Sequence, residues 1–253
     1  MRKSILLIIL TFIICFGLQC CKQQGSDLDI YLLIGQSNMA GRAAITEDVM
    51  DTLQGVFLFT LDSLARWEPA VNPLNKYSTI RKRIEMQKLG PGYAFAREMK
   101  IAYPEREIGL VVNAKGGTSI MKWMPGTHFY QEAVRRTLDA MQDGQLKGIL
   151  WHQGSSDSRR TDTYLDSLVK MVHQLRHDLG EPELPFVAGE LSEDKPHKIP
   201  FNVMLRELPM RLENAAVVSA EGTSTLDSTH FDTRSQVLLG EKYFAKMTEL
   251  LHK

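Results

Sequence analysis

The stretch "GQSN" (35–38) places three polar side chains next to one another directly after an apolar run. The run "YLLI" (31–34) has the composition of a buried strand. A serine at a strand-to-helix turn has its hydroxyl at the rim of the sheet and its N–H near a helix N-terminus, where negative charge is favoured. Ser37 could therefore attack a carbonyl carbon and form an oxyanion beside its own N–H. The alternative is that Ser37 or Asn38 only caps the helix.

Two later loops offer further hydrogen-bond donors. The block "NAKGGTSI" (113–120) contains Gly116 and Gly117, which allow a ligand to approach the backbone closely. The same pair is also typical of a turn that needs positive φ. The block "WHQGSSD" (151–157) contains Gln153, whose amide could donate to an oxyanion. Taken alone, this block is equally well a polar loop.

A serine nucleophile requires a general base, and the chain contains seven histidines. His230 is the best candidate because Asp227 precedes it by three residues in "DSTHFD". That spacing lets the carboxylate hold Nδ1–H while Nε2 accepts the serine proton. Of the other histidines, His128 and His152 lie where they could reach the rim of a sheet. An isolated Asp-x-x-His pair is weak evidence, and the order Ser37, Asp227, His230 is more informative.

Short apolar runs alternate with segments of helical period along the rest of the chain. Runs rich in Val, Leu and Ile predict strands at 29–34, 55–59, 107–112, 147–152, 185–190 and 215–219. Apolar spacings of three and four, together with the segment "GYAFAREMKIA", predict helices at 92–102, 129–143, 165–179 and 237–251. This alternation predicts a mostly parallel sheet covered by helices, with ligand sites at the carboxyl ends of the strands. The three candidate loops should therefore meet at one rim.

One irregular region, 61–91, is long for a compact domain, and loops of that length are usually functional. Its basic cluster "RKR" (81–83) is interpreted as solvated surface.

The first 20 residues have the pattern of a signal peptide. Arg2 and Lys3 precede the apolar run 5–18, which is too short for a comfortable membrane span of about 20 residues. The run ends in "LQCCKQQGS", which resembles a loose bacterial lipobox with Cys21 as the lipidated residue. The sequence thus predicts export and a lipid anchor in the bacterial cell envelope. Ordinary cleavage with release to the periplasm or medium, or retention as a signal anchor, are the alternatives. The expected organisation is a signal peptide (1–20), a short tether (21–28) and one domain (29–253).

Composition excludes several other classes of protein. All three cysteines, Cys15, Cys20 and Cys21, lie in the N-terminal segment, so the domain can have no internal disulfide, thiolate nucleophile or cysteine metal site. Without residues 1–20, 28 basic residues face 30 acidic ones, a net charge of −2 that argues against nucleic acid as the main partner. The oligomeric state is open.

Four blocks, "IGQSNMAGR", "KGGTSIMKW", "WHQGSSD" and "DSTHF", resemble the successive blocks of the SGNH-type hydrolases. Within these enzymes the chain resembles the sialate O-acetylesterase-like and carbohydrate esterase 6 branch. The segments 67–75 and 90–99 resemble intervening parts of the same branch, so the resemblance covers nearly all of 29–247. It implies a flavodoxin-like, three-layer α/β/α fold and removal of acetyl groups from carbohydrate hydroxyls, with no metal and no cofactor. The partner is then an acetylated carbohydrate.

The resemblance also implies roles for individual residues. Ser37 matches the nucleophile, His230 the general base and Asp227 the acid that orients it. The oxyanion hole would comprise the N–H groups of Ser37 and Gly117 and the side chain of Gln153. Ser155 departs from the pattern, because the branch commonly has Glu at this position.

Further side chains are candidate substrate contacts. Arg42 is a candidate partner for a sialic-acid carboxylate, and Trp67 and Trp123 are candidates for stacking on a sugar ring or for packing under the long loop. The remaining candidates are Gln36, Asn38 and His152, and Gln36 and Asn38 could instead only brace the turn. Two other functions stay open: an esterase or lipase for other small acyl esters, and a surface glycan-binding lipoprotein without turnover.

Overall fold

The computed structural model of the chain describes residues 28–253 and contains a seven-stranded sheet. Neighbouring strands are parallel, except that β3 pairs antiparallel with β2. The expected signal peptide, the lipidated Cys21 and nearly all of the expected tether lie outside the described residues. The strands are β1 (Leu28–Gly35), β2 (Leu53–Phe59), β3 (Trp67–Ala70), β4 (Glu107–Ala114), β5 (Gln145–His152), β6 (Phe186–Gly189) and β7 (Ala215–Val218).

The strand order is β3-β2-β4-β1-β5-β6-β7, which places β1 in the middle of the sheet. From β1 the chain builds one half of the sheet through β2, β3 and β4, and then crosses β1 to build the other half. The carboxyl end of β1 is therefore a topological switch point, where doubly wound sheets form their ligand crevice. Gly35 ends β1 at this point, between the ends of β4 and β5.

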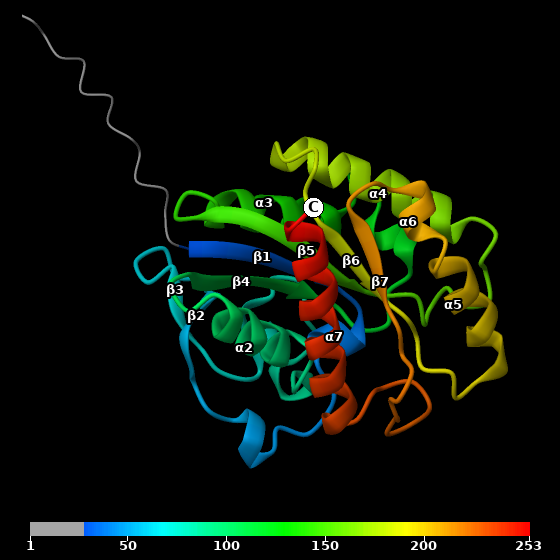
Figure 1. The fold of residues 1–253 in the computed structure, drawn as a ribbon, viewed down its shortest axis with the longest axis horizontal. Helices are drawn as coiled ribbons and strands as arrows, with labels where there is room; N and C mark the ends of the chain where they lie inside the picture. Colours follow the sequence, from blue (N-terminus) through cyan, green and yellow to red (C-terminus); the bar gives the residue numbers. More distant parts are fainter. Residues whose placement is uncertain (1–27) are drawn as a thin grey trace, which may run out of the picture.

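Helices cover both faces of the sheet (Figure 1). On one face α2 and α7 pack together, and on the other α3, α4, α5 and α6 share a core. Alternate residues of β1 point into the two cores, as the period of two in a strand requires. The helices are α1 (Ser37–Ala40), α2 (Gly92–Ala102), α3 (His128–Ala140), α4 (Tyr164–Leu179), α5 (Ile199–Leu205), α6 (Leu208–Arg211) and α7 (Thr233–Leu251).

Local sequence sets the ends of the two longest helices. α4 stops at Gly180, which has a left-handed φ of 73°. α7 begins after Asp232, whose carboxylate accepts the N–H of Ser235 at 2.9 Å. The loop just before this cap carries Asp227 and His230, so α7 anchors the candidate base and its partner.

The six predicted strands, the four predicted helices and the α/β fold class are confirmed, with element ends shifted by a few residues. β3 was not predicted, because its four residues contain Pro69, which is tolerated in an edge strand but obscures the pattern. The helices α5 and α6 were also missed, because both are short and begin with a proline in the first turn. Among residues 28–253, no helix is both long and apolar enough to cross a membrane.

Candidate active site

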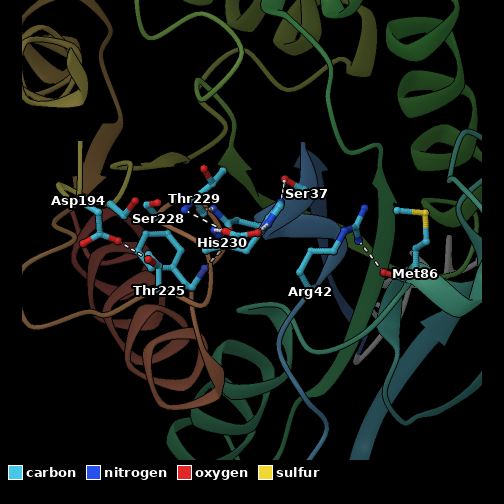
Figure 2. Close-up of polar contacts among 12 residues, drawn as sticks. Ser37, Arg42, Met86, Asp194, Thr225, Ser228, Thr229 and His230 are labelled. Carbon is cyan, nitrogen blue, oxygen red and sulfur yellow. Dashed lines mark hydrogen bonds and ion pairs between the residues drawn. The ribbon is translucent and has the colours of Figure 1, made fainter. Parts of the chain in front are cut away.

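Ser37, Asp227 and His230 come together at the carboxyl end of β1. Oδ2 of Asp227 lies 2.6 Å from Nδ1 of His230, and Nε2 of His230 lies 3.0 Å from Oγ of Ser37. Because a carboxylate can only accept, Nδ1 carries the proton and the lone pair of Nε2 faces the hydroxyl. Figure 2 shows Ser37 and His230 pointing toward each other from elements at opposite ends of the chain. This is the geometry in which an imidazole can take a proton from serine.

Asp227 is held as an anion by the turn in which it lies. Its Oδ1 accepts the N–H groups of Thr229 at 3.1 Å and of His230 at 2.8 Å. Partial burial works against the charged form, but the hydrogen bonds from the side chain and backbone of His230 outweigh it. The pKa of Asp227 therefore lies below its usual value. Asp227 thus stays ionised and able to orient the imidazole.

Asn38 connects the serine turn to the histidine turn. Its Nδ2 donates to Thr229 O at 3.0 Å, and its Oδ1 accepts the N–H of Phe231 at 3.2 Å. The two bonds hold the backbone on either side of His230. Asn38 was predicted as a substrate contact. The structure favours the alternative, in which Asn38 braces a turn, because its buried amide holds the histidine turn and is not part of the pocket lining.

The turn at the end of β1 requires glycine. Gly35 has a φ of 137°, and a Cβ there would lie 2.4 Å from the carbonyl oxygen of His152. Close packing lets the next residue, Gln36, donate its N–H to that oxygen at 2.8 Å. The N–H of Ser37 then starts a four-residue helix and has no acceptor among the described residues. It is free to donate into the pocket.

The Gly-Gly pair after β4 forms the facing wall of the pocket. A Cβ on Gly116 would lie 3.1 Å from Cβ of Ser37 and 2.6 Å from Nη2 of Arg42. Gly117 has a left-handed φ of 75°, and its N–H has no acceptor among residues 28–253. The two glycines therefore line the same pocket as Ser37, with the N–H of Gly117 left as a free backbone donor among the described residues.

Gln153 does not supply the predicted third donor. Its side chain is fully buried, and its Nε2 donates to Thr118 O at 2.8 Å and to Asp157 Oδ2 at 2.6 Å. Its Oε1 accepts the hydroxyl of Tyr164 at 2.8 Å. Both N–H bonds of the amide are thus committed, and Gln153 ties the loop after β5 to the loop after β4. This corrects the role inferred from the resemblance.

A different amide faces the pocket. Oε1 of Gln36 accepts the N–H of Gly154 at 3.2 Å, which fixes which end of the amide is oxygen. The Nε2 end has no acceptor in the described part of the chain and is not among its fully enclosed polar atoms. Gln36 lines the same pocket as Ser37. Its amide is therefore a free donor next to the serine.

Three aromatic or imidazole side chains that were candidates for substrate contact lie elsewhere. His152 is fully buried, and its Nδ1 faces the hydroxyl of Tyr243 at 3.0 Å. Trp123 is buried against Trp151 and donates to Thr118 Oγ1 at 3.1 Å. Trp67 packs on Phe59 and donates to Asp143. None of these rings is part of the pocket lining, so the structure gives no support to His152 as a substrate contact, and the two tryptophans follow the alternative of packing.

The pocket above Ser37 has a volume of about 320 Å³. Arg42 lies on the side away from the histidine turn and donates through Nη1 to Gly41 O and Met86 O (Figure 2). Lys82 lines the same pocket and has no ion-pair partner among the described residues. The full lining is Gln36, Ser37, Arg42, Lys82, Met86, Gly116, Gly117, Ser155, Ser156, Thr229 and His230.

This lining carries two cations and no carboxylate. Arg42 was predicted as a contact, whereas Lys82 and Met86 were missed because the basic cluster was interpreted as solvated surface. The length of the region 61–91 was the signal that could have found them. Ser155 contributes only a hydroxyl, so the departure from Glu leaves the pocket without an acid. The pocket is therefore suited to a polar ligand that carries negative charge. In residues 28–253, no cluster of three or more His, Cys, Asp or Glu side chains could hold a metal ion.

Comparisons with known proteins agree with the fold and show the family of the chain. The sequence matches the family model described as carbohydrate esterase, sialic acid-specific acetylesterase, over residues 27–249. The chain therefore belongs to this family, within the SGNH-type hydrolases, and is a carboxylic ester hydrolase. It is 33% identical over 230 residues to a protein of Arabidopsis thaliana named "Probable carbohydrate esterase", covering 83% of this chain and 86% of the relative.

Two solved structures share the fold. An X-ray structure of a protein from Arabidopsis thaliana superposes with a TM-score of 0.79 and 28% identity, covering 88% of this chain and 98% of that one. A carbohydrate acetylesterase from Xanthomonas citri superposes with a TM-score of 0.66 and 18% identity, covering 88% of this chain and 57% of that one. At that identity the second likeness concerns the fold alone.

Proposed function

We propose that this carbohydrate esterase is a serine enzyme that removes O-acetyl groups from sugars through an acyl-enzyme intermediate. The observation that carries the proposal is the hydrogen-bonded series Asp227, His230, Ser37, with contacts of 2.6 and 3.0 Å, at the floor of a pocket with free N–H donors. Its components lie nearly 200 residues apart in the sequence, as the separation of 193 between Ser37 and His230 shows. If Ser37 only capped its helix, it would not need to contact a histidine from the C-terminal part of the chain.

The reaction follows from the positions of the protons. Oγ of Ser37 attacks the acetyl carbon while Nε2 of His230 takes the hydroxyl proton, and Asp227 stabilises the resulting imidazolium. The tetrahedral intermediate collapses when His230 gives this proton to the sugar oxygen, which leaves as an alcohol. Water then attacks the acetyl-serine, with His230 again as base, and acetate leaves with the original serine restored.

Three donors are proposed to stabilise the oxyanion. They are the backbone N–H groups of Ser37 and Gly117 and the side-chain amide of Gln36, which takes the part that the sequence assigned to Gln153. All three belong to residues that line the pocket and lack acceptors among the described residues. Preorganised donors of this kind contribute about 10²–10³ in rate each.

The charge of the pocket favours an acetylated sugar that bears a carboxylate. Arg42 and Lys82 lie in a lining without acidic side chains, so a carboxylate would be the first counter-charge in the pocket. The family description, a sialic acid-specific acetylesterase, agrees with this chemistry. We therefore propose O-acetylated sialic acid as the substrate class, ahead of acetylated neutral sugars.

The test compares O-acetylated N-acetylneuraminic acid with its methyl ester, in which the carboxyl group is neutral, and measures acetate release. We expect kcat/KM for the acid to be higher by about tenfold, which corresponds to about 1.4 kcal/mol. The substitution Lys82→Met should reduce that preference, because it removes one of the two pocket cations. Arg83→Met is the matched control, since Arg83 is exposed in the same basic cluster and does not line the pocket.

Equal rates on the acid and its methyl ester would contradict the substrate class. Release of acid from small acyl esters but from no acetylated sugar would favour a general esterase. Binding of acetylated glycans with no release of acetate would favour a binding protein.

We also propose that the protein is exported and tethered to the cell envelope through a lipid on Cys21. Support comes from Arg2 and Lys3, the apolar run 5–18 and the lipobox-like segment before Cys21. The substitution Cys21→Ala should move the protein from the membrane fraction to the soluble fraction of cells that express the full chain. An unchanged membrane association would contradict the lipid anchor.

A further inference from the structure

A buried lysine lies beneath the turn that carries Asp227 and His230, and no step of the proposed reaction uses it. Lys198 ends the short 3₁₀ turn Pro196–Lys198 and is 2% exposed. Burying an ammonium group is costly unless hydrogen-bond acceptors replace its water. Its Nζ donates to Ser228 O at 2.6 Å and to Ser192 Oγ at 2.8 Å.

The charge of Lys198 is not neutralised by a salt bridge. None of the ion pairs of the described residues includes it, and both hydrogen-bond partners are neutral. Burial lowers the pKa of Lys198, and the nearby charge of Lys195 lowers it further, whereas the carboxylates of Asp194 and Asp227 favour the ammonium form. Asp227 therefore lies within the electrostatic reach of this ammonium group.

The contact of Lys198 falls at the most constrained residue of the turn. Ser228 has a positive φ of 59°, a conformation that non-glycine residues adopt at a cost. Its carbonyl belongs to the peptide that joins Ser228 to Thr229, between Asp227 and His230. A hydrogen bond to this carbonyl therefore fixes the path of the backbone between Asp227 and His230.

The turn is held from two opposite directions. Asn38, beside the nucleophile, holds the carbonyl of Thr229, while Lys198, in the segment after β6, holds the carbonyl of Ser228. The carboxylate of Asp194, in the same segment, accepts the hydroxyl of Thr225 at the start of the turn (Figure 2). The segment 192–198 therefore forms a second support on the side away from Ser37.

We propose that Lys198 is a positioning residue for the esterase reaction. Its ammonium group holds Ser228 O, keeps the left-handed turn closed, and so keeps the imidazole of His230 aimed at Ser37. Its positive charge also favours the ionised form of Asp227. The inference rests on the proposed function, because it gives Lys198 a role only if Asp227 and His230 activate a serine.

The test is Lys198→Met, which keeps an unbranched chain of similar length and removes both the donor and the charge. We expect kcat for acetate release to fall by about tenfold to a hundredfold, because small misplacements of a catalytic base have effects of that size. KM should stay within about twofold, since Lys198 does not line the pocket. The rate at which a fluorophosphonate labels Ser37 should fall in parallel, because it reports activation of the serine without sugar binding.

Lys195→Met is the matched control. Lys195 lies in the same segment and close enough to Lys198 to lower the pKa of that lysine, but its side chain makes no hydrogen bond to the turn within the described chain. Its kcat should stay within about twofold of the parent. If Lys198→Met does not fold, Ser192→Ala takes its place, because it removes one of the two acceptors of Nζ; we expect a loss in kcat of about threefold with KM unchanged.

A folded Lys198→Met, or a folded Ser192→Ala in its place, that keeps full kcat would overturn the inference. Equal losses of kcat in Lys195→Met and Lys198→Met would also overturn it. Failure of the proposed function would be distinct, because Ser37→Ala would then retain activity. If Ser37→Ala is inactive and Lys198→Met is fully active, the proposed function stands and the role of Lys198 falls.

Discussion

At the scale of single residues, the pocket depends on which of two glutamines has a free amide. Gln153 and Gln36 both follow strands of the central sheet, and both have side chains that are 2% exposed or less. Gln153 satisfies both of its N–H bonds inside the protein, whereas Gln36 satisfies only its oxygen. The Nε2 of Gln36 is not enclosed, so it can donate to a ligand or water that enters the pocket. Gln36 is therefore the amide available to a reacting acetyl group.

The substitution Gln36→Glu tests this assignment. The new carboxylate can still accept the N–H of Gly154, but it offers no donor and places negative charge near the oxyanion. We expect kcat to fall by about 10²-fold or more, with KM changed far less, because the lost bond forms in the transition state. The check is steady-state acetate release, with circular dichroism to confirm folding. A variant with unchanged kcat would show that Gln36 does not face the oxyanion.

Gln153→Glu is the informative contrast. It would place a second carboxylate 2.6 Å from Oδ2 of Asp157, so its main effect should be on stability.

The candidate triad could be predicted from the sequence, whereas the third oxyanion donor could not. The spacing of Asp227 and His230 is local, and Ser37 follows an apolar strand at the rim. The choice between Gln36 and Gln153 depends on Thr118 O and Asp157, two acceptors supplied by other loops. Lys82 was missed for the same reason, since its place in the pocket depends on how a long loop folds back.

At the scale of elements, the loop after β4 is shaped by glycine conformation. Gly117 has a φ of 75°, which L-residues adopt at a cost, while the space around a Cβ there is nearly open. A side chain at this position would therefore destabilise the protein through the unfavourable φ of the backbone and not through a steric clash. Because the N–H of Gly117 is a proposed oxyanion donor, its direction matters for the reaction.

We predict that Gly117→Ala costs about 1–2 kcal/mol of stability and also lowers kcat. Gly126→Ala is a matched control, because Gly126 has a φ of 84°, open space around its Cβ and no place in the pocket. Both variants should lose similar stability in urea unfolding, and only Gly117→Ala should lose kcat beyond about threefold. Equal kcat in the two variants would argue that the Gly117 N–H does not contact the reacting carbonyl.

Sequence patterns at this scale were reliable for long elements and weak for short ones. The strands that form the central sheet are apolar on both faces, and α4 has one continuous apolar stripe, so both are visible without a structure. β3 and α6 have four residues each, too few for a period to appear. The segment 192–198 gives no sequence signal of its role, because that role depends on contacts with a turn some 30 residues away.

At the scale of the whole molecule, the core on the α7 side of the sheet contains a buried histidine, His152, whose ring packs against Phe231 and Tyr243. The hydroxyl of Tyr243 donates to Trp151 O at 2.8 Å, so its oxygen accepts from His152 and Nδ1 carries the proton. Nε2 of His152 is enclosed and has no hydrogen-bond partner among residues 28–253. Burial lowers the pKa of His152 from 6.5 to about 4. The folded protein therefore keeps this ring neutral, whereas the unfolded chain protonates it near pH 6.5.

This difference predicts a loss of stability in acid. Above pH 6.5 both states are neutral at His152 and the ring has no effect on the pH dependence. Between about pH 6.5 and pH 4 only the unfolded chain binds the proton, so stability falls as the pH falls. Between pH 7 and pH 5, protonation of this one histidine in the unfolded chain should lower the free energy of unfolding by about 2 kcal/mol.

The variant His152→Asn isolates the effect, because the Asn amide can donate to Tyr243 but cannot take up a proton in this range. Urea unfolding at pH 7 and pH 5 gives the loss of unfolding free energy between the two pH values. This loss should be smaller for the variant than for the parent by about 2 kcal/mol. Equal losses would mean that His152 is protonated in the folded state or is not buried.

The central claim is that Ser37 is the nucleophile, and Ser37→Ala tests it most directly. The measurement is acetate release from O-acetylated N-acetylneuraminic acid by parent and variant, with matched unfolding curves to show that both are folded. The proposed mechanism predicts a loss of about 10³-fold or more in kcat, because Ser37 carries the hydroxyl that faces Nε2 of His230. A folded Ser37→Ala protein that retains kcat within about tenfold of the parent would contradict it.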